Sequence, residues 1–161
     1  MLLKKLTLPE LLHNSCSLFK NNLSLNFVQS GKRTYQDLYK EVLSISNYLV
    51  ASGIRKGDKV AILSASMPNW GITQFAIAQV GAIAVPVLPG FSTPEIQNIL
   101  EHSETKIIFV SKLLYKLVAD IHTDTLEKKV LMNTFAEIPE GYPIADIEKL
   151  ENNIDLNNPT P

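Results

Sequence analysis

Apolar residues recur at helical spacing early in the chain. Four of them lie at positions i, i+4, i+7 and i+11, the spacing of one helix face: Leu38, Val42, Ile45 and Leu49. Thr34, with Asp37 three residues later, is typical of a helix N-terminus. Gly53 suits the position just past the last turn, where a left-handed backbone costs glycine little. The pattern predicts a helix over 35–51.

Four short apolar runs have the character of strands that are buried on both faces. They occupy 59–64, 82–87, 106–110 and 129–132. Their successive positions are apolar rather than alternating with polar ones, as in strands of parallel sheets that are covered on both sides. The runs therefore predict four strands of one sheet.

Helical segments are expected between these runs. Ser66 and Pro68 suit the start of the first helix and Gly81 its end. Ser-Thr-Pro-Glu at 92–95 suits the start of the second, and a third is expected to continue to Ile121. The resulting βαβαβαβ order predicts an α/β fold, a right-handed wound parallel sheet flanked by helices.

Both ends of the chain depart from this alternation. Near the N-terminus we expect a helix over 8–19 and then a small hairpin with its turn at Ser30-Gly31. From Pro139 the chain is rich in turn residues, and one further helix is expected over 144–151 before an Asn- and Pro-rich end.

Composition narrows the class of protein. The 161 residues carry a net charge of -1, so we expect no basic face for nucleic acid. Cys16 is the only cysteine, which excludes an internal disulfide and most thiolate metal sites. No apolar stretch has the length of a transmembrane span, and the N-terminus lacks the apolar core of a secretory signal. We expect a cytoplasmic protein and leave peripheral membrane contact open.

Wound sheets bind ligands beyond the carboxyl ends of their strands, and those ends carry no acidic residue here. The segments concerned are 64–66, 88–90, 111–112 and 133–134. Aspartate-based phosphoryl-transfer or magnesium sites are therefore not expected. The sequence also has neither common glycine-rich phosphate loop.

The remaining chemically capable side chains favour structural roles. His13, His102 and His122 are far apart along the chain, so we expect them at the surface or at helix ends. We expect Cys16 to be a small buried thiol and Trp70 to belong to the core. The residues alone therefore predict a fold without a complete active site.

Five segments follow one another with the motifs of a known family. They read TYQDL at 34–38, GIRKGDKVAI at 53–62, MPNW at 67–70, GAIAVPV at 81–87, and TPEI with ILEHSETKII within 93–108. Over roughly residues 5–115 the chain thereby resembles the adenylate-forming (AMP-binding) superfamily, and in particular the N-terminal part of long-chain fatty acid and other acyl-CoA synthetases. MPNW departs from the family's N-x-P-E-W, because its asparagine is displaced and the glutamate is missing from its place.

The resemblance implies a parent enzyme that activates a carboxylic acid, expected to be a fatty acid, using ATP, magnesium and coenzyme A. In the family, the phosphate loop, the magnesium-binding pair and the catalytic lysine come later in the chain. The resemblance thus implies that 1–150 form a truncated N-terminal subdomain and that 151–161 are a linker toward the missing phosphate loop. We expect no catalytic or metal-binding residue here, no bound cofactor, and no activity of the chain alone.

The resemblance also points to two loops near the coenzyme A nucleotide. In similar synthetases the loops after the second and third predicted strands approach that nucleotide. The residues at these places are Pro89, Gly90, Lys112 and Lys116. Gly90 leaves room for close backbone approach, and either lysine could pair with a phosphate. The alternative is a tight turn at Pro89-Gly90 and two solvated lysines.

Other readings stay open. A freestanding non-catalytic α/β module that binds a partner through its open sheet edge predicts a reading frame that stops near Pro161. A small nucleotide-binding protein is disfavoured by the absent phosphate loop. Separating a subdomain from its neighbour exposes apolar surface, so we also expect the isolated chain to self-associate.

Overall fold

The computed structural model describes residues 7–27 and 30–150. Its centre is a five-stranded sheet with the order β4-β3-β5-β6-β7. The strands are β3 (Lys59–Leu63), β4 (Ile83–Val87), β5 (Thr105–Val110), β6 (Lys128–Leu131) and β7 (Ala136–Ile138). The first four pair in parallel and β7 runs antiparallel to β6. The predicted wound parallel sheet is confirmed, and β7 is an addition that the sequence pattern did not predict.

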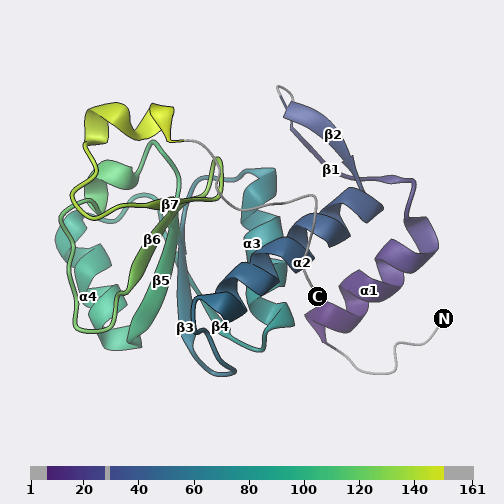
Figure 1. Cartoon of the computed structure of the whole chain (residues 1–161), viewed down its shortest axis with the longest axis horizontal. Helices are drawn as coiled ribbons and strands as arrows, with labels where there is room; N and C mark the ends of the chain where they lie inside the picture. Colours follow the sequence, from purple (N-terminus) through teal and green to yellow (C-terminus); the bar gives the residue numbers. More distant parts are fainter. Residues whose placement is uncertain (1–6, 28–29, 151–161) are drawn as a thin grey trace.

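Helices cover both faces of this sheet. The described residues form α1 (Leu8–Phe19), α2 (Tyr35–Ala51), α3 (Pro68–Gln79), α4 (Thr93–Ser103) and two short 3-10 helices, η1 (Tyr115–Leu117) and η2 (Ile144–Lys149). A separate antiparallel hairpin of β1 (Leu23–Phe27) and β2 (Ser30–Thr34) contacts α2. In Figure 1, α2 and α3 lie on one side of the sheet and α4 on the other, while α1 packs against α2 and α3.

Successive residues of the central strands point to opposite faces, and both faces are buried. The cluster on the side of α2 and α3 contains every second strand residue: Val60, Ile62, Ile107, Phe109 and Val130. The cluster on the side of α4 contains the intervening ones: Ala61, Leu63, Ile108, Val110 and Leu131. Burial on both faces is the reason why these strands are apolar at successive positions.

The helix predicted from apolar spacing is confirmed as α2, and its four spaced residues are buried. Its N-terminus is a capping box. The main-chain N–H and the hydroxyl of Thr34 donate to Oδ2 of Asp37 at 3.0 and 2.7 Å, and the Asp37 N–H donates to Thr34 Oγ1 at 3.2 Å. Gly53 has a φ of +86° just past the helix, as expected.

The prediction of an α-helix after β5 is wrong. The segment holds only the 3-10 helix η1. Further hydrogen bonds between residues three apart extend to Ile121, whose N–H donates to Val118 O at 3.1 Å. The buried residues of the segment are Tyr115, Val118 and Ile121, spaced by three. A spacing of three suits the tighter 3-10 geometry, in which residues i and i+3 lie on the same side.

Three smaller expectations concern the hairpin and the C-terminal end. The hairpin turn does not lie at Ser30-Gly31, because β2 begins at Ser30 and both residues belong to the strand. The segment expected to be helical over 144–151 forms the 3-10 helix η2, which ends at Lys149. The expected linker over 151–161 lies outside the described residues.

Pro86 lies inside the edge strand β4. The Ile83 N–H donates to Asp58 O at 2.8 Å, toward β3. Because amide direction alternates along a strand, the nitrogen of Pro86, three residues later, faces the outer edge. Proline is tolerated there because no ladder hydrogen bond is lost.

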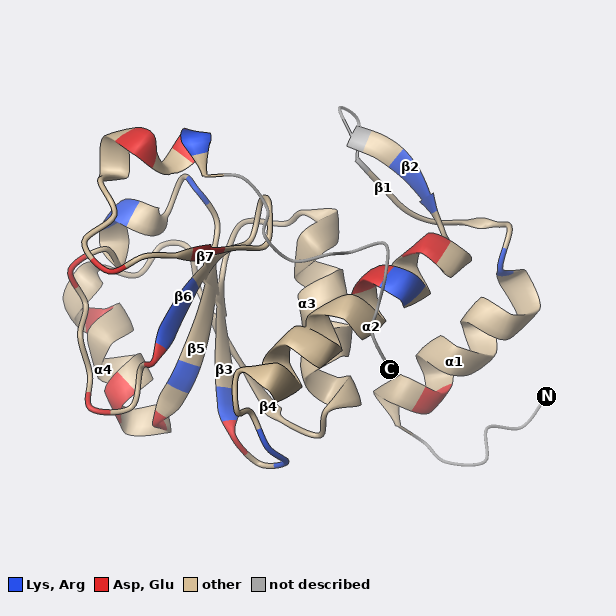
Figure 2. Cartoon of the chain, viewed as in Figure 1, with Lys and Arg blue, Asp and Glu red and all other residues tan. Residues whose placement is uncertain are grey.

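Charged residues of both signs are interspersed over the molecule, and α3 carries none (Figure 2). The uncharged composition of α3 agrees with its position between α1, α2 and the sheet. Within residues 7–27 and 30–150, no helix combines the length and the apolar content needed to cross a membrane.

Candidate functional site

The carboxyl ends of the parallel strands meet at one edge of the sheet, which is the general place for ligands in wound sheets. Because β3 lies between β4 and β5, the loops after β4 and β5 flank the end of β3. The four residues predicted near coenzyme A lie on these two flanking loops: Pro89, Gly90, Lys112 and Lys116. The topology thus brings both predicted loops to the same edge.

The loop after β4 is a tight turn. Phe91 N–H donates to Leu88 O at 3.1 Å, which closes the turn over Pro89 and Gly90. Both of these residues are exposed. Gly90 lacks the positive φ that would require glycine, and a Cβ built on it would meet no atom within 4 Å. The chain's own packing therefore leaves the space beside Gly90 open.

Lys112 is held at both its main chain and its side chain. Its N–H donates to Asn133 Oδ1 at 2.8 Å, and its Nζ lies 3.0 Å from Glu148 Oε1 on η2. The ion pair is solvent-exposed, with Glu148 71% exposed, and pairs of this kind contribute little to stability. A phosphate could therefore replace Glu148 as the partner of Lys112 at small cost.

Lys116 lies one turn further along the same loop and is exposed, with no hydrogen bond or ion pair to another described residue. Its neighbour Tyr115 anchors the loop, because the ring is 1% exposed and the hydroxyl donates to Tyr142 O at 2.9 Å. Burial raises the pKa of Tyr115 above its usual value. The loop is thus anchored by Tyr115 while its two ammonium groups face solvent.

A hollow of about 250 Å³ lies at the carboxyl end of β3, the strand that lies between β4 and β5 in the sheet. It is lined by Ser64, Ser66, Met67 and Trp70. Trp70 packs against the core on the side of α2 and α3, as expected, but it is only partly buried. The hollow therefore combines two hydroxyls with an indole and a thioether.

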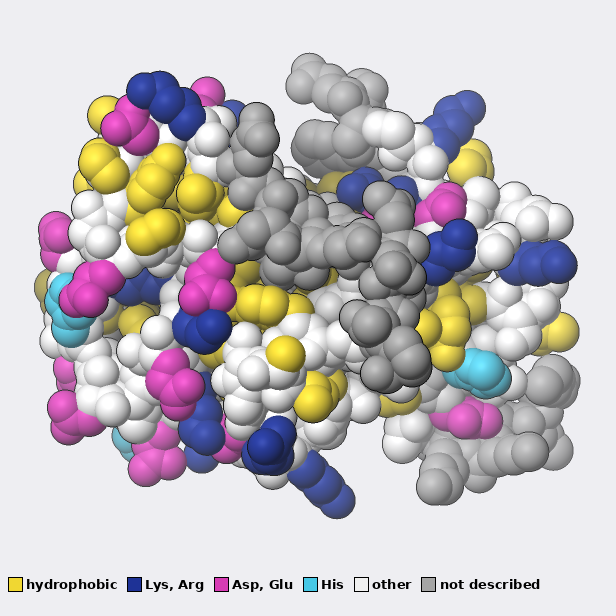
Figure 3. All heavy atoms as spheres, in the orientation of Figure 1, with side chains coloured by type: hydrophobic (Ala, Val, Ile, Leu, Met, Phe, Trp, Pro, Cys, Tyr) yellow, Lys and Arg dark blue, Asp and Glu magenta, His cyan; other side chains and the backbone are white. Residues whose placement is uncertain are grey.

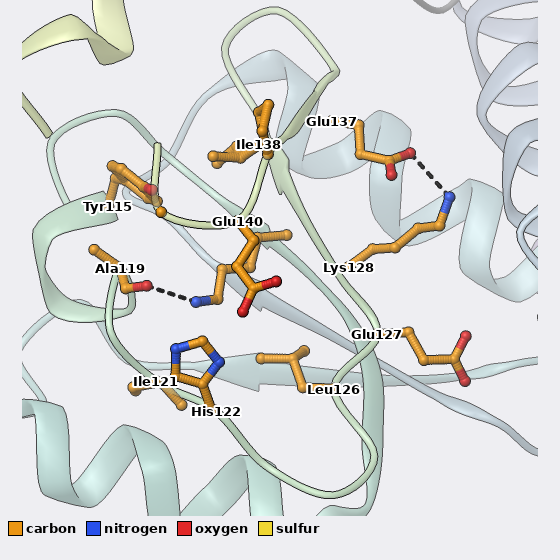
Figure 4. Close-up of a pocket in the computed structure, with 13 residues that line it drawn as sticks. Tyr115, Ala119, Ile121, His122, Leu126, Glu127, Lys128, Glu137, Ile138 and Glu140 are labelled. Carbon is orange, nitrogen blue, oxygen red and sulfur yellow. Dashed lines mark hydrogen bonds and ion pairs between the residues drawn. The ribbon is translucent and has the colours of Figure 1, made fainter. Parts of the chain in front are cut away.

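A second hollow of about 250 Å³ lies beside β6 and β7, and Tyr115 and Ala119 from the segment after β5 also line it (Figure 4). Its cations are already engaged. Lys129 Nζ donates to Ala119 O at 2.7 Å and Lys128 Nζ lies 2.9 Å from Glu137 Oε2. Burial lowers the pKa of Lys129. With Glu140 also lining it, this hollow has mixed charge and favours neither an anion nor a cation.

The other candidate side chains behave as structural groups. His102 and His122 are exposed, and His13, also exposed, lies 3.3 Å from the Tyr39 hydroxyl through Nδ1. Cys16 is buried, as expected, and burial raises the pKa of its thiol, which disfavours the reactive thiolate. Over the described ranges, no three His, Cys, Asp or Glu residues lie together in a way that could hold a metal ion.

Sequence reasoning missed the residues that hold Lys112. The sequence pattern identifies Asn133 only as an uncharged residue at a strand end, and it gives no indication of Glu148. Asn133 is 21 residues from Lys112 and Glu148 is 36 residues from it. The one signal in the sequence is that Asn133 follows β6 and Lys112 follows β5, so that both lie at the same edge of the sheet.

Residues 13–160 match the family of AMP-binding enzymes, and the chain belongs to this family. It is 33% identical over 113 residues to crotonobetaine/carnitine–CoA ligase of Citrobacter koseri, which is 70% of this chain and 21% of that protein. It is 23% identical over 154 residues to long-chain-fatty-acid–CoA ligase of Bacillus subtilis, which is 92% of this chain and 27% of that protein. The chain thus spans about a fifth to a quarter of the length of these relatives.

The fold is similar to that of solved CoA ligases. The crystal structure of the anthranilate CoA ligase AuaEII in complex with anthranoyl-AMP superposes with a TM-score of 0.75. The superposition covers 94% of this chain and 28% of that one at 23% sequence identity. The wound sheet with its flanking helices is therefore the fold found in part of such a ligase.

Proposed function

We propose that this chain is the N-terminal subdomain of an AMP-forming carboxylic acid–CoA ligase, which we call the parent. The proposed reaction converts a carboxylic acid, ATP and coenzyme A to acyl-CoA, AMP and pyrophosphate. The observation that carries the proposal is the family match over residues 13–160. The sequenced reading frame beyond Pro161 tests it: a S/T-G-T-T-G-x-P-K-G phosphate loop within a few tens of codons is expected. An immediate stop codon would favour the freestanding interaction module instead.

We further propose that the isolated chain is inactive and lies in the cytoplasm, with peripheral membrane contact left open. The sequence contains no phosphate loop, and the described residues offer no cluster for magnesium. ATP and magnesium would then be bound by later residues of the parent. Calorimetry of the isolated chain with ATP and magnesium is expected to give no heat of binding, whereas measurable binding would contradict this part of the proposal.

A fatty acid is the proposed substrate. A long-chain-fatty-acid–CoA ligase aligns over 92% of this chain, which supports this choice, whereas the relative at 33% identity acts on crotonobetaine and carnitine by its name. An acid-dependent exchange of pyrophosphate with ATP, measured on the parent, separates the two. Dodecanoate or palmitate is expected to give faster exchange than crotonobetaine and acetate. The reverse order of rates would exclude a fatty acid.

The direct contribution proposed for this chain is contact with the coenzyme A nucleotide. Pro89 and Gly90 would admit the nucleotide beside the main chain, and Lys112 and Lys116 would pair with its phosphates. Truncating both lysines to alanine in the parent is expected to raise KM for coenzyme A and to leave pyrophosphate exchange unchanged. The matched control is Lys149→Ala, an exposed lysine whose one ion-pair partner among the described residues is Asp146. An unchanged KM in the double variant would remove this assignment.

A further inference from the structure

The main chain at Lys112 is held by a side chain rather than by a strand. Ser111 N–H donates to Leu63 O at 3.0 Å, which extends the β3–β5 ladder by one residue. The next amide, that of Lys112, donates to the side-chain Oδ1 of Asn133 at 2.8 Å. Asn133 therefore fixes the direction in which the chain leaves the sheet.

Asn133 lies on the turn between β6 and β7, and Asn69 of α3 binds this turn. Asn69 Nδ2 donates to Met132 O at 2.7 Å and to Asn133 O at 3.3 Å. Asn69 Oδ1 accepts from Nη2 of Arg33 at 3.3 Å. Because both ends of this amide are engaged, a half-turn of the group would place donor against donor and acceptor against acceptor.

Arg33 is itself fixed by an ion pair. Its Nε donates to both carboxylate oxygens of Glu41 on α2, at 3.0 and 2.9 Å. The two side chains are only 23% and 17% exposed. A series of hydrogen bonds thus runs from Arg33 on β2, through Asn69, to the turn that carries Asn133 and so to Lys112.

The same turn contains an unfavourable backbone conformation. Phe135 has a φ of +58° and is 1% exposed, with its ring edge-on to Phe109 at 6.3 Å between centroids. A left-handed backbone is unusual for a bulky residue and persists where surrounding contacts hold it. The two hydrogen bonds from Asn69 are such contacts.

We propose that Asn133 and Asn69 are positioning residues for the Lys112 loop: Asn133 binds the Lys112 amide, and Asn69 holds the turn that presents Asn133. The structural half of this inference stands independently of the parent's activity. The functional half, that this arrangement sets the affinity for coenzyme A, rests on the proposed function. Neither asparagine contacts the nucleotide in this proposal.

The structural half is tested on this chain by measuring, with NMR, the rate of hydrogen exchange at the Lys112 amide. Asn133→Ala and Asn69→Ala are expected to speed its exchange by about five- to tenfold, the effect of one ordinary hydrogen bond. Asn133→Asp keeps the acceptor oxygen and should preserve protection, whereas Asn69→Asp loses its donors and should not. Asn98→Ala, an exposed residue of α4, is the control. Wild-type exchange of Lys112 in Asn133→Ala overturns the inference.

The functional half is tested in the parent by steady-state kinetics. Asn133→Ala is expected to raise KM for coenzyme A about five- to tenfold with kcat and pyrophosphate exchange little changed, and Asn133→Asp to restore it. If exchange at Lys112 is faster but KM is unchanged, the functional half is overturned while the structural half stands. If truncating both Lys112 and Lys116 to alanine also leaves KM unchanged, the coenzyme assignment itself has failed.

Discussion

The hydroxyl of Tyr48 on α2 donates a hydrogen bond of 3.1 Å to Oε2 of Glu137 on β7. Lys128 on β6 lies 2.9 Å from the same carboxylate oxygen, and its Nζ lies 5.7 Å from the centre of the Tyr48 ring. The three residues connect α2 to the edge of the sheet formed by β6 and β7. This contact between distant segments gives the short strand β7 a partner outside its own hairpin.

Tyr48→Phe is expected to lower the free energy of unfolding by about 1–2 kcal/mol, because it removes a partly buried hydrogen bond to a charged group. Urea denaturation at pH 7 measures the change. Tyr35→Phe is the control, since the Tyr35 hydroxyl has no hydrogen bond to another described residue. Equal stability of the Tyr48 and Tyr35 variants would contradict the prediction.

The same variant has a predicted pH signature at the alkaline end. Burial raises the pKa of Tyr48 well above its usual range, so the folded chain keeps the phenol proton where the unfolded chain loses it near pH 10. Stability contributed by this group is complete below about pH 10 and falls as pH rises further. Tyr48→Phe should therefore flatten the alkaline decline of stability, measured by urea midpoints between about pH 9 and 11.

Asp37 in the capping box of α2 predicts an acid-side effect. The Thr34 main-chain hydrogen bond, followed by that of its hydroxyl, lowers the pKa of Asp37. Its contribution is present above the unfolded pKa of about 3.9 and is lost as pH falls through the lower folded value. Asp37→Ala should cost about 1 kcal/mol at pH 7 and progressively less below pH 4. A constant difference from pH 7 to pH 2 would contradict this assignment.

Glu104 offers a stabilising substitution. It ends α4 with φ 55° and ψ 43°, a left-handed conformation that favours glycine. Its ion pair with Lys59 is exposed and contributes little. Glu104→Gly is expected to raise the free energy of unfolding by about 1 kcal/mol. Glu101→Gly, inside the same helix, should lower it by about as much, and stabilisation by both or by neither would refute the explanation.

Self-association of the isolated chain is expected to involve the edge of the sheet at which the parallel strands end. Leu113 is 74% exposed and Leu88 62% exposed, on the two loops that flank β3, and Figure 3 shows hydrophobic side chains gathered near the position of η2. Sedimentation velocity should show concentration-dependent association that Leu88→Ser with Leu113→Ser reduces. Leu18→Ser on α1, 56% exposed, should not reduce it. A strict monomer at high concentration would exclude the prediction.

Local sequence signals were sufficient for most of the fold. The strands β3 to β6 were predicted because each is a continuous apolar run, and α2 because its apolar spacing extends over several turns. The helices α3 and α4 were predicted because residues typical of a helix start, such as Pro68, follow these runs. The strand β7 has three residues, too few for any period, and it is defined by pairing with β6. The segment after β5 looked helical because spacings of three and of 3.6 are hard to distinguish over two turns.

The candidate site was predictable as a location and not as a network. The predicted parallel sheet places Gly90 and Lys112 at one edge, since parallel strands end together, and the family resemblance points to their two loops. The bond between Lys112 and Asn133 joins a main-chain amide to a side chain on another strand connection. Contacts of this kind depend on how the two turns meet in space, which no local pattern in a single sequence encodes.

Pro86 restricts how copies of this chain can join. The outer margin of β4 lacks one of the amide donors that an added strand would require, because the proline nitrogen carries no hydrogen. Continuous edge-to-edge pairing of the sheets of two copies would thus be interrupted at β4. Clusters of the isolated chain should then dissolve readily on dilution rather than mature into fibres.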